Sequence, residues 1–118
     1  MYAYESHDKV DIRVVRIFNT FGPRMNPLDG RVVSNFIVQS LKKEDMTVYG
    51  DGSYTRSFQY CHDLIDGLFR VMNNKYTQPV NLGNPEEFTV LHFAEEIKRI
   101  TKGESSIIHL PKVTDDPT

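Results

Sequence analysis

The amino-acid sequence predicts a mixed α/β fold with short strands and three main helices. Short runs of β-branched and apolar residues, typical of strands, alternate along the 118 residues with segments whose apolar residues recur at helical spacing. Clusters of Gly, Pro, Asn and Asp separate these segments, as turns require. Neither an internal repeat nor a low-complexity stretch interrupts the pattern. A chain of this length is enough for one small domain or one lobe of a larger protein.

The expected strands are short, and each ends at a turn signal. The segment 11–18 (DIRVVRIF) is rich in β-branched residues and runs into a loop expected over 19–23, where Gly22 and Pro23 stop regular structure. Further turns are expected over 26–30, 50–53 and 83–85. The other strands are expected at 46–49, 57–60, 79–82 and 107–110.

The expected helices follow from apolar residues at intervals of three and four. Residues 2–8 look like the end of a helix without an N-terminal cap. A helix over 31–43 presents Val32, Val33, Phe36, Ile37 and Leu41, and another, beginning near Asp63, presents Leu64, Ile65, Leu68, Phe69 and Met72. Thr89 is expected to cap a third helix and Gly103 to follow its end; its core face is Leu91, Ala94, Ile97 and Ile100. Leu64, Leu68, Phe69, Leu91 and Ile97 are expected in the core.

Composition excludes several classes of function. The net charge is −2 and the pI is about 6.0, so bulk attraction to nucleic acid or an anionic membrane is not expected. No apolar run approaches the roughly 20 residues that span a bilayer. Cys61 is the single cysteine, so there is no intrachain disulfide. We expect no metal site, because the histidines lack a metal-ligand spacing: His7, His62, His92 and His109.

One group of loop residues suggests a ligand with phosphates. Asn19, Arg24, Arg31 and Arg56 each lie in or beside a Gly/Pro loop next to an expected strand, and Tyr49 and Tyr54 precede the last arginine. Guanidinium groups form bidentate hydrogen bonds with phosphate oxygens, and an aromatic ring offers a flat face to a base. By spacing alone these arginines could equally be solvated surface residues. The sequence has no GxGxxG loop that would hold a dinucleotide pyrophosphate.

Four ordered segments carry a family resemblance over essentially the whole chain. They are RIFNTFGPRM (16–25), DGRVVSNFI (29–37), TVYGDGSYTRSFQY (47–60) and VNLGNPEE (80–87). Together they resemble the extended short-chain dehydrogenases that act on nucleotide sugars, and among these the UDP-glucuronate decarboxylases. The resemblance implies a Rossmann-like NAD-binding fold, of which this chain is mainly the small substrate-binding lobe.

The same resemblance implies that some parts of the enzyme are absent. Family members open with a dinucleotide-binding domain bearing GxxGxxG and carry a YxxxK pair for the redox step, neither of which occurs here. We therefore expect residues 1–118 to be the substrate-binding, C-terminal part, without the N-terminal dinucleotide-binding part and the extreme C-terminus. No catalytic residue is expected in this chain, which by itself is expected to be inactive.

For the whole enzyme the resemblance implies bound NAD and conversion of UDP-glucuronate to UDP-xylose and CO₂. The sugar C4 hydroxyl is oxidised, the carboxylate β to the new ketone is lost as CO₂, and the ketone is reduced again. Asn19 is expected at the diphosphate and sugar, Val48 and Tyr49 at uracil and ribose, and Arg56 at the diphosphate. Arg31 and Val32 are expected beside the nucleotide at a helix start. The cofactor is expected to meet Thr20, Asn26 and Arg31.

Other interpretations remain open at this stage. The chain could be part of a dTDP-glucose 4,6-dehydratase or a UDP-sugar epimerase, because the segment that selects the reaction lies outside it. It could also be a non-catalytic module that binds nucleotide sugars, or a purely structural domain. The resemblance implies a homodimer for the full-length enzyme and no contact of this segment with nucleic acid or membrane. The compartment, cytoplasm or Golgi lumen, is not determined by these residues.

Overall fold

The computed structural model describes residues 1–112, and the chain divides into two compact units. Unit 1 combines Met1–Gly22 with Phe58–Pro85. Unit 2 combines Pro23–Ser57 with the chain from Glu86 onward. Each unit is therefore built from two segments that are distant in sequence. The α/β class expected from the sequence is confirmed.

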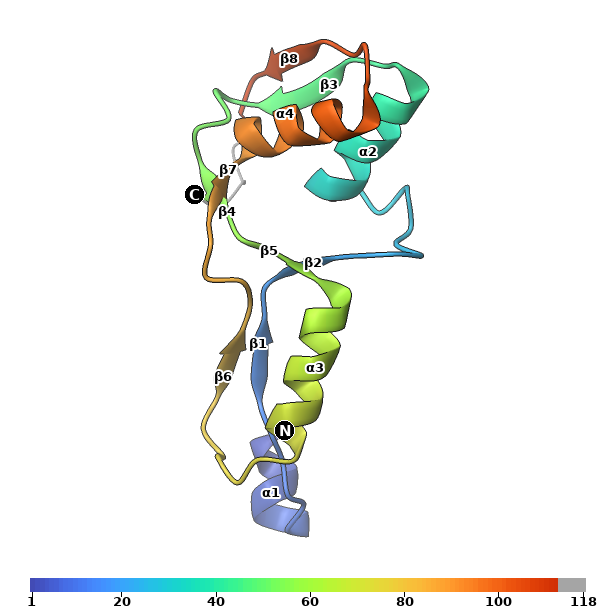
Figure 1. The fold of residues 1–118 in the computed structure, drawn as a ribbon. Helices are drawn as coiled ribbons and strands as arrows, with labels where there is room; N and C mark the ends of the chain where they lie inside the picture. Colours follow the sequence, from blue (N-terminus) through green and yellow to red (C-terminus); the bar gives the residue numbers. More distant parts are fainter. Residues whose placement is uncertain (113–118) are drawn as a thin grey trace. The chain divides into compact units, whose positions relative to one another are not determined.

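Unit 1 is a pair of short parallel ladders with one long helix against them. Strand β1 (Val15–Ile17) pairs with β6 (Val80–Leu82), and β2 (Asn19–Phe21) pairs with β5 (Phe58–Tyr60). Helix α3 (Cys61–Met72) packs along β2, β5 and β6, and α1 (Tyr2–Asp8) precedes β1 (Figure 1). The chain thus changes its ladder partner at Phe18, where the Phe18 N–H still donates to the Leu82 carbonyl at 2.9 Å.

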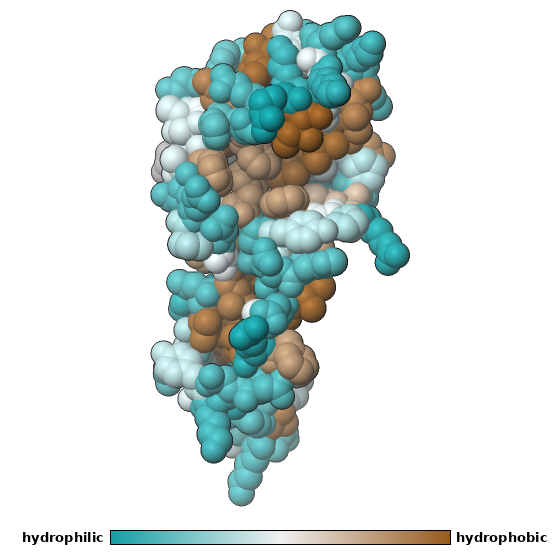
Figure 2. Space-filling view, in the orientation of Figure 1, coloured by the Kyte–Doolittle hydropathy of each residue, from teal (hydrophilic) through white to brown (hydrophobic). Residues whose placement is uncertain are grey.

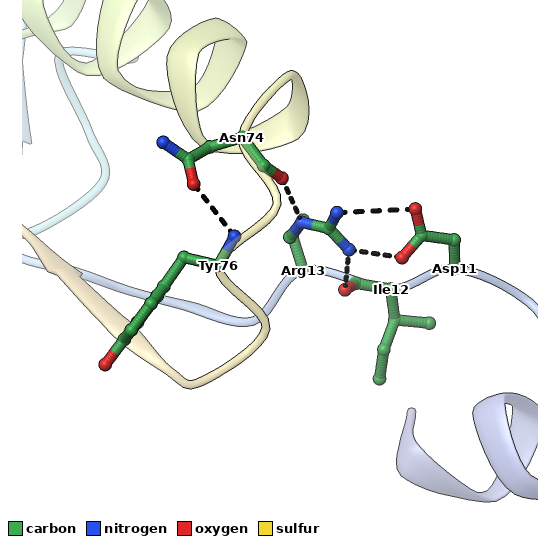
Figure 3. A network of polar contacts seen from close by, with 5 residues as sticks. All are labelled: Asp11, Ile12, Arg13, Asn74 and Tyr76. Atoms are coloured by element: carbon green, nitrogen blue, oxygen red, sulfur yellow. Dashed lines mark hydrogen bonds and ion pairs between the residues drawn. The ribbon is translucent and has the colours of Figure 1, made fainter.

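Arg13 attaches the segment before β1 to the turn after α3 (Figure 3). Its Nε donates to the Asn74 carbonyl at 2.8 Å, and its Nη1 donates to the Ile12 carbonyl at 2.7 Å and pairs with Asp11. Asn74 also accepts the Tyr76 N–H at 2.8 Å, which shapes the approach to β6. Only 15% of the Arg13 side chain is exposed, so it is a structural link rather than a ligand group.

Unit 2 places two helices on a parallel strand pair. Strand β3 (Met46–Tyr49) pairs with β8 (Ile107–Leu110), and α4 (Val90–Thr101) directly precedes β8 (Figure 1). Helix α2 (Val32–Lys42) packs on β3 and α4, and β4 (Thr55–Arg56) pairs antiparallel with β7 (Phe88–Thr89). The buried core of this unit comes from α2, β3 and α4: Phe36, Met46, Val48, Val90, Ala94 and Ile97.

Of the two caps expected for α4, the structure confirms the one at its N-terminus. The Thr89 hydroxyl accepts the His92 N–H at 3.1 Å, which confirms the N-terminal cap. At the other end Lys102, not Gly103, takes the left-handed conformation, with φ at 50°. A Cβ on Gly103 would lie 2.5 Å from the Ser40 Oγ. Gly103 is therefore required for close packing rather than for its backbone freedom.

Several element boundaries differ from the sequence expectation. The strand expected over 11–18 is confined to Val15–Ile17, and residues 19–21, expected as a loop, form β2. The short β4 and β7 were not expected, and α3 begins at Cys61, ahead of Asp63. The differences in the strands involve pairing with segments far away in sequence, which local composition does not encode.

The expected core is partly correct for unit 2 and wrong for much of α3. Ile97 is buried and Leu91 is half-buried, but Ile100 is 69% exposed. In α3 Leu64 and Leu68 are half-buried, whereas Phe69 is 62% exposed and no α3 residue is buried. Apolar surface reaches solvent on both units (Figure 2). Helical spacing identifies an apolar face, but not whether anything within the chain covers it. Among the described helices, none has the length and apolar character needed to cross a membrane.

Candidate functional site

A cavity of about 430 Å³ lies in unit 1 beyond the carboxyl ends of three strands. Phe21 ends β2, Tyr60 ends β5 and Leu82 ends β6. In open α/β sheets this edge is where ligands bind, because strand-end loops and helix starts meet there. The residues that line the cavity are Phe21, Phe58, Gln59, Tyr60, Asp63, Leu82, Gly83 and Asn84.

Aromatic rings and one tightly packed glycine shape this cavity. The rings of Phe21 and Tyr60 lie 5.8 Å apart between centroids, and those of Tyr60 and His62 lie 5.0 Å apart, both tilted. A Cβ on Gly83 would lie 2.2 Å from the Phe18 ring. The wall formed by β6 and its following turn therefore depends on a residue without a side chain.

Asn19 and Thr20, two predicted ligand residues, lie on β2 ahead of Phe21 and are not among the residues that line the cavity. Asn19 is exposed, opposite Phe58 in the ladder, and Thr20 is half-buried, opposite Gln59. The Thr20 hydroxyl donates to the Phe18 carbonyl at 2.9 Å and accepts from the Gln59 Nε2 at 3.0 Å. Its proton is therefore already engaged, and the lone pair that remains can only accept a hydrogen bond.

In unit 2, the predicted nucleotide residues lie at the end of β3 and on β4. Val48 is fully buried in the core, so its side chain supports the strand rather than offering a contact. Tyr49, the next residue, is 40% exposed. The Arg56 guanidinium lies 5.1 Å from the centroid of the Tyr54 ring, and its Nη1 donates to the Thr55 carbonyl at 2.9 Å. A ring packed against a guanidinium restricts its orientation, and a guanidinium can form bidentate hydrogen bonds with an anion.

The turn between these strands is stabilised by its own carboxylate. Asp51 accepts the Ser53 N–H at 3.0 Å and the Ser53 hydroxyl at 2.7 Å, and these bonds lower the pKa of Asp51. His109 on β8 forms a hydrogen bond through Nδ1 with the Gly50 carbonyl at 2.9 Å. Gly52 is buried, and a Cβ there would lie 2.9 Å from Val48. The loop from Tyr49 to Arg56 is thus anchored at several points.

The start of α2 holds Arg31 and a carboxylate that the sequence reasoning missed. Asp29 accepts the Arg31 N–H at 3.1 Å and the Ser34 hydroxyl, and its Oδ2 lies 3.4 Å from the Arg31 Nε. The Ser34 hydroxyl and then the Arg31 N–H lower the pKa of Asp29. Arg31 is 66% exposed in its side chain, yet part of its charge is already balanced. The Asn26 Oδ1 accepts the Leu28 N–H at 3.0 Å, which leaves the amide nitrogen available for a ligand.

Comparison with known proteins places the chain in a family. The profile of the NAD dependent epimerase/dehydratase family matches residues 1–83. The chain belongs to this family. A protein named UDP-glucuronic acid decarboxylase 1 from Danio rerio is 57% identical over 116 residues, which are 98% of this chain and 28% of that protein. Its namesake from Arabidopsis thaliana is 54% identical over 108 residues, which are 92% of this chain and 25% of that protein.

The epimerase/dehydratase fold is also found by comparing structures. The crystal structure of UDP-glucuronic acid 4-epimerase from Bacillus cereus, in complex with UDP-glucuronic acid and NAD, superposes with a TM-score of 0.84 at 27% identity. The match covers 98% of this chain and 37% of that protein. The chain thus spans about a quarter to a third of the length of the curated relatives named here.

The predicted residues of this family member fall into separate groups. Asn19 and Thr20 lie in unit 1, and the remaining predicted residues lie in unit 2: Asn26, Arg31, Val32, Val48, Tyr49 and Arg56. Val32 is half-buried and packs against the core, which limits the contact its side chain can make. Sequence reasoning missed Gln59, although a glutamine between two aromatic residues of a short strand is an unusual signal. Within residues 1–112, no three His, Cys, Asp or Glu side chains gather as a metal site.

Proposed function

We propose that residues 1–118 form the nucleotide-sugar-binding part of an NAD-dependent UDP-glucuronate decarboxylase. The observation that carries the proposal is the 57% identity, over 98% of the chain, with the Danio rerio protein of that name. The Bacillus cereus structure supports the ligands, since that relative holds UDP-glucuronic acid and NAD. The proposed reaction converts UDP-glucuronate into UDP-xylose and CO₂. The dinucleotide-binding part would be contributed by residues outside this chain.

The residues of unit 1 fit the nicotinamide end of the cofactor. The Thr20 hydroxyl, on β2 next to the cavity-lining Phe21, keeps a lone pair that suits an amide N–H or a ribose O–H donor. When bound, NAD supplies the oxidation of the sugar C4 hydroxyl and the later reduction of the ketone. Loss of CO₂ between these steps is favoured because the electron pair moves onto the C4 ketone oxygen. Asn19 on the same strand is proposed to hold the sugar and diphosphate in position.

The residues of unit 2 suit the nucleotide. Arg56, supported by the Tyr54 ring, is proposed to pair with the diphosphate, and Tyr49 to pack on the uracil and ribose. Val48 is buried in the core and so keeps the neighbouring Tyr49 in position. Arg31 and Asn26 are proposed to contact the cofactor, with Arg31 and the start of α2 at Val32 also beside the substrate. The pairing of Arg31 with Asp29 already balances part of the Arg31 charge.

A UDP-sugar epimerase is the second candidate, because the Bacillus cereus epimerase superposes on 98% of the chain. The test is the holoenzyme, meaning this chain together with a dinucleotide-binding part, either its own or that of the Danio rerio relative. It is supplied with UDP-glucuronate labelled at the carboxylate carbon. We expect labelled CO₂ and UDP-xylose. UDP-galacturonate without CO₂ would establish the epimerase instead, and preference for dTDP over UDP in a saturation assay would indicate a dehydratase.

Three further expectations belong to the same proposal. We propose that the full enzyme is a homodimer, which sedimentation of the holoenzyme tests. We also expect the 118-residue chain alone to release no CO₂ and to bind NAD only weakly, because it has no glycine-rich phosphate loop. The chain alone is further expected to self-associate, or to fold only marginally, because of the segment 12–18, in which Ile17 and Phe18 are 52% and 41% exposed. Micromolar NAD affinity, or a monodisperse monomer that melts cooperatively, would contradict these expectations.

A further inference from the structure

Gln59 occupies the place in unit 1 where the chain changes strand partners. Residues 15–17 pair with β6, and residues 19–21 pair with β5. Phe18 lies between the two ladders. The Gln59 Nε2 lies 3.0 Å from the Leu82 carbonyl and 3.0 Å from the Thr20 Oγ1. It also lies 3.4 Å from the Phe18 carbonyl. One amide therefore joins the ends of three strands.

Because Gln59 is buried, the donor and the acceptor of each hydrogen bond around it can be assigned. Gln59 is only 6% exposed, so its amide nitrogen has little access to water and its two N–H groups depend on these partners. The Leu82 and Phe18 carbonyls can only accept, which fixes the amide with its nitrogen toward them. Thr20 must then accept from Gln59, and its own proton goes to the Phe18 carbonyl at 2.9 Å. The hydroxyl is left with one lone pair that can accept a further hydrogen bond.

We infer that Gln59 is a positioning residue that holds the Thr20 hydroxyl as a hydrogen-bond acceptor for the bound cofactor. The inference rests on the proposed function, in which Thr20 meets the nicotinamide end of NAD. Gln59 itself lines the cavity but acts through Thr20. Without its amide, the Thr20 hydroxyl keeps only its bond to the Phe18 carbonyl, and it loses the buried donor that fixes and polarises it as an acceptor. Cofactor binding should then weaken without any direct contact being removed.

The test is a double-mutant cycle for NAD binding in the holoenzyme, measured by calorimetry below the melting temperature. Gln59→Met keeps the length of the side chain and removes its amide. We expect it to raise the NAD dissociation constant by about two- to tenfold, the range of one hydrogen bond. Thr20→Val should have an effect of similar size. Because Gln59 acts through Thr20, the double variant should bind NAD as Thr20→Val does, rather than showing the product of both effects.

Gln39 provides a matched control in unit 2. Its Nε2 donates to the Thr47 Oγ1 at 3.0 Å and its Oε1 accepts the Thr47 N–H at 3.1 Å, so Gln39→Met also removes a glutamine–threonine contact. It should lower the melting temperature but leave NAD affinity unchanged. Gln59→Glu is the second variant at the proposed position. Its ionised carboxylate cannot donate, so NAD binding should become pH-dependent and recover as the carboxyl is protonated at lower pH.

The possible results separate the two proposals. Unchanged NAD affinity in Gln59→Met, or multiplying effects in the double variant, would overturn the role of Gln59 while leaving the decarboxylase proposal intact. If Thr20→Val binds NAD normally, the inference also fails. If the wild-type holoenzyme binds NAD but releases no CO₂, the decarboxylase proposal fails and the cycle still decides the role of Gln59. Should Gln59→Met not fold, pH-dependent binding in Gln59→Glu supports the inference and pH-independent binding overturns it.

Discussion

Replacing Arg56 with alanine should weaken the binding of UDP and UDP-sugars to the holoenzyme. The guanidinium lies 5.1 Å from the Tyr54 ring centroid and donates to the Thr55 carbonyl, so it is held in place before any ligand arrives. A diphosphate that leaves water needs its charge balanced, and a hydrogen bond to a charged group contributes about 1.5–3 kcal/mol. Because about 1.4 kcal/mol is tenfold, Arg56→Ala should raise the UDP dissociation constant by roughly ten- to a hundredfold.

Two further variants at this position test the geometry behind that estimate. Arg56→Lys keeps the charge but not the planar pair of donors, so it should recover only part of the lost affinity. Tyr54→Leu removes the half-buried ring beside the guanidinium and should weaken binding less than Arg56→Ala does, since a cation–π contact contributes about 0.5–2 kcal/mol.

Calorimetric titration measures the UDP dissociation constant of wild type and of each variant, and Arg99→Ala serves as the control. Arg99 is an exposed arginine on α4 whose Nη2 lies 2.7 Å from the Glu96 Oε2. Its removal changes the net charge as Arg56→Ala does, so any long-range effect of charge appears in both variants. We expect UDP affinity in Arg99→Ala to stay within about twofold of wild type. Equal affinities in wild type, Arg56→Ala and Arg56→Lys would refute the assignment of Arg56 to the diphosphate.

Three predictions concern stability and are measured by thermal or urea unfolding of the same protein. Gly83→Ala should destabilise unit 1 by about 1–3 kcal/mol, because its Cβ would lie 2.2 Å from the Phe18 ring; an unchanged melting temperature would show that the ring moves freely. Thr89→Ala should cost about 1 kcal/mol through the lost cap of α4, and Thr89→Ser should retain most of it, whereas equal losses would contradict the capping role. The Ser34 hydroxyl lowers the pKa of Asp29 in the folded protein. The ionised carboxylate therefore stabilises the fold at pH values above its ordinary pKa of 3.8, and this stabilisation is lost as the pH falls through the lower folded-state pKa. The stability difference between wild type and Asp29→Asn should therefore disappear in acid, and a pH-independent difference would contradict this.

Much of the candidate site could be predicted from local sequence because its residues lie in short, ordered motifs. The turn Gly50–Ser53 has glycines at both positions where φ is positive, 69° and 73°, so the loop between Tyr49 and Arg56 is determined by residues within it. The Thr89 cap and the apolar spacing of α4 are equally local. Such features depend on neighbours a few positions away, which the sequence displays directly.

The roles of other residues depended on contacts between distant segments. Asn19–Phe21 forms a strand only because β5, nearly forty residues later in the chain, offers it a ladder, and Gln59 becomes informative only when three strand ends meet around it. Phe69 matches the helical pattern of a core residue, yet it is 62% exposed. The sequence by itself determined the class of fold, the turn at Gly50–Ser53, the Thr89 cap and the motifs that place the chain in its family. Which strands pair, which polar groups are buried together and which apolar faces remain uncovered were decided by the tertiary structure, because burial and partner choice are properties of the assembled chain and not of any short segment.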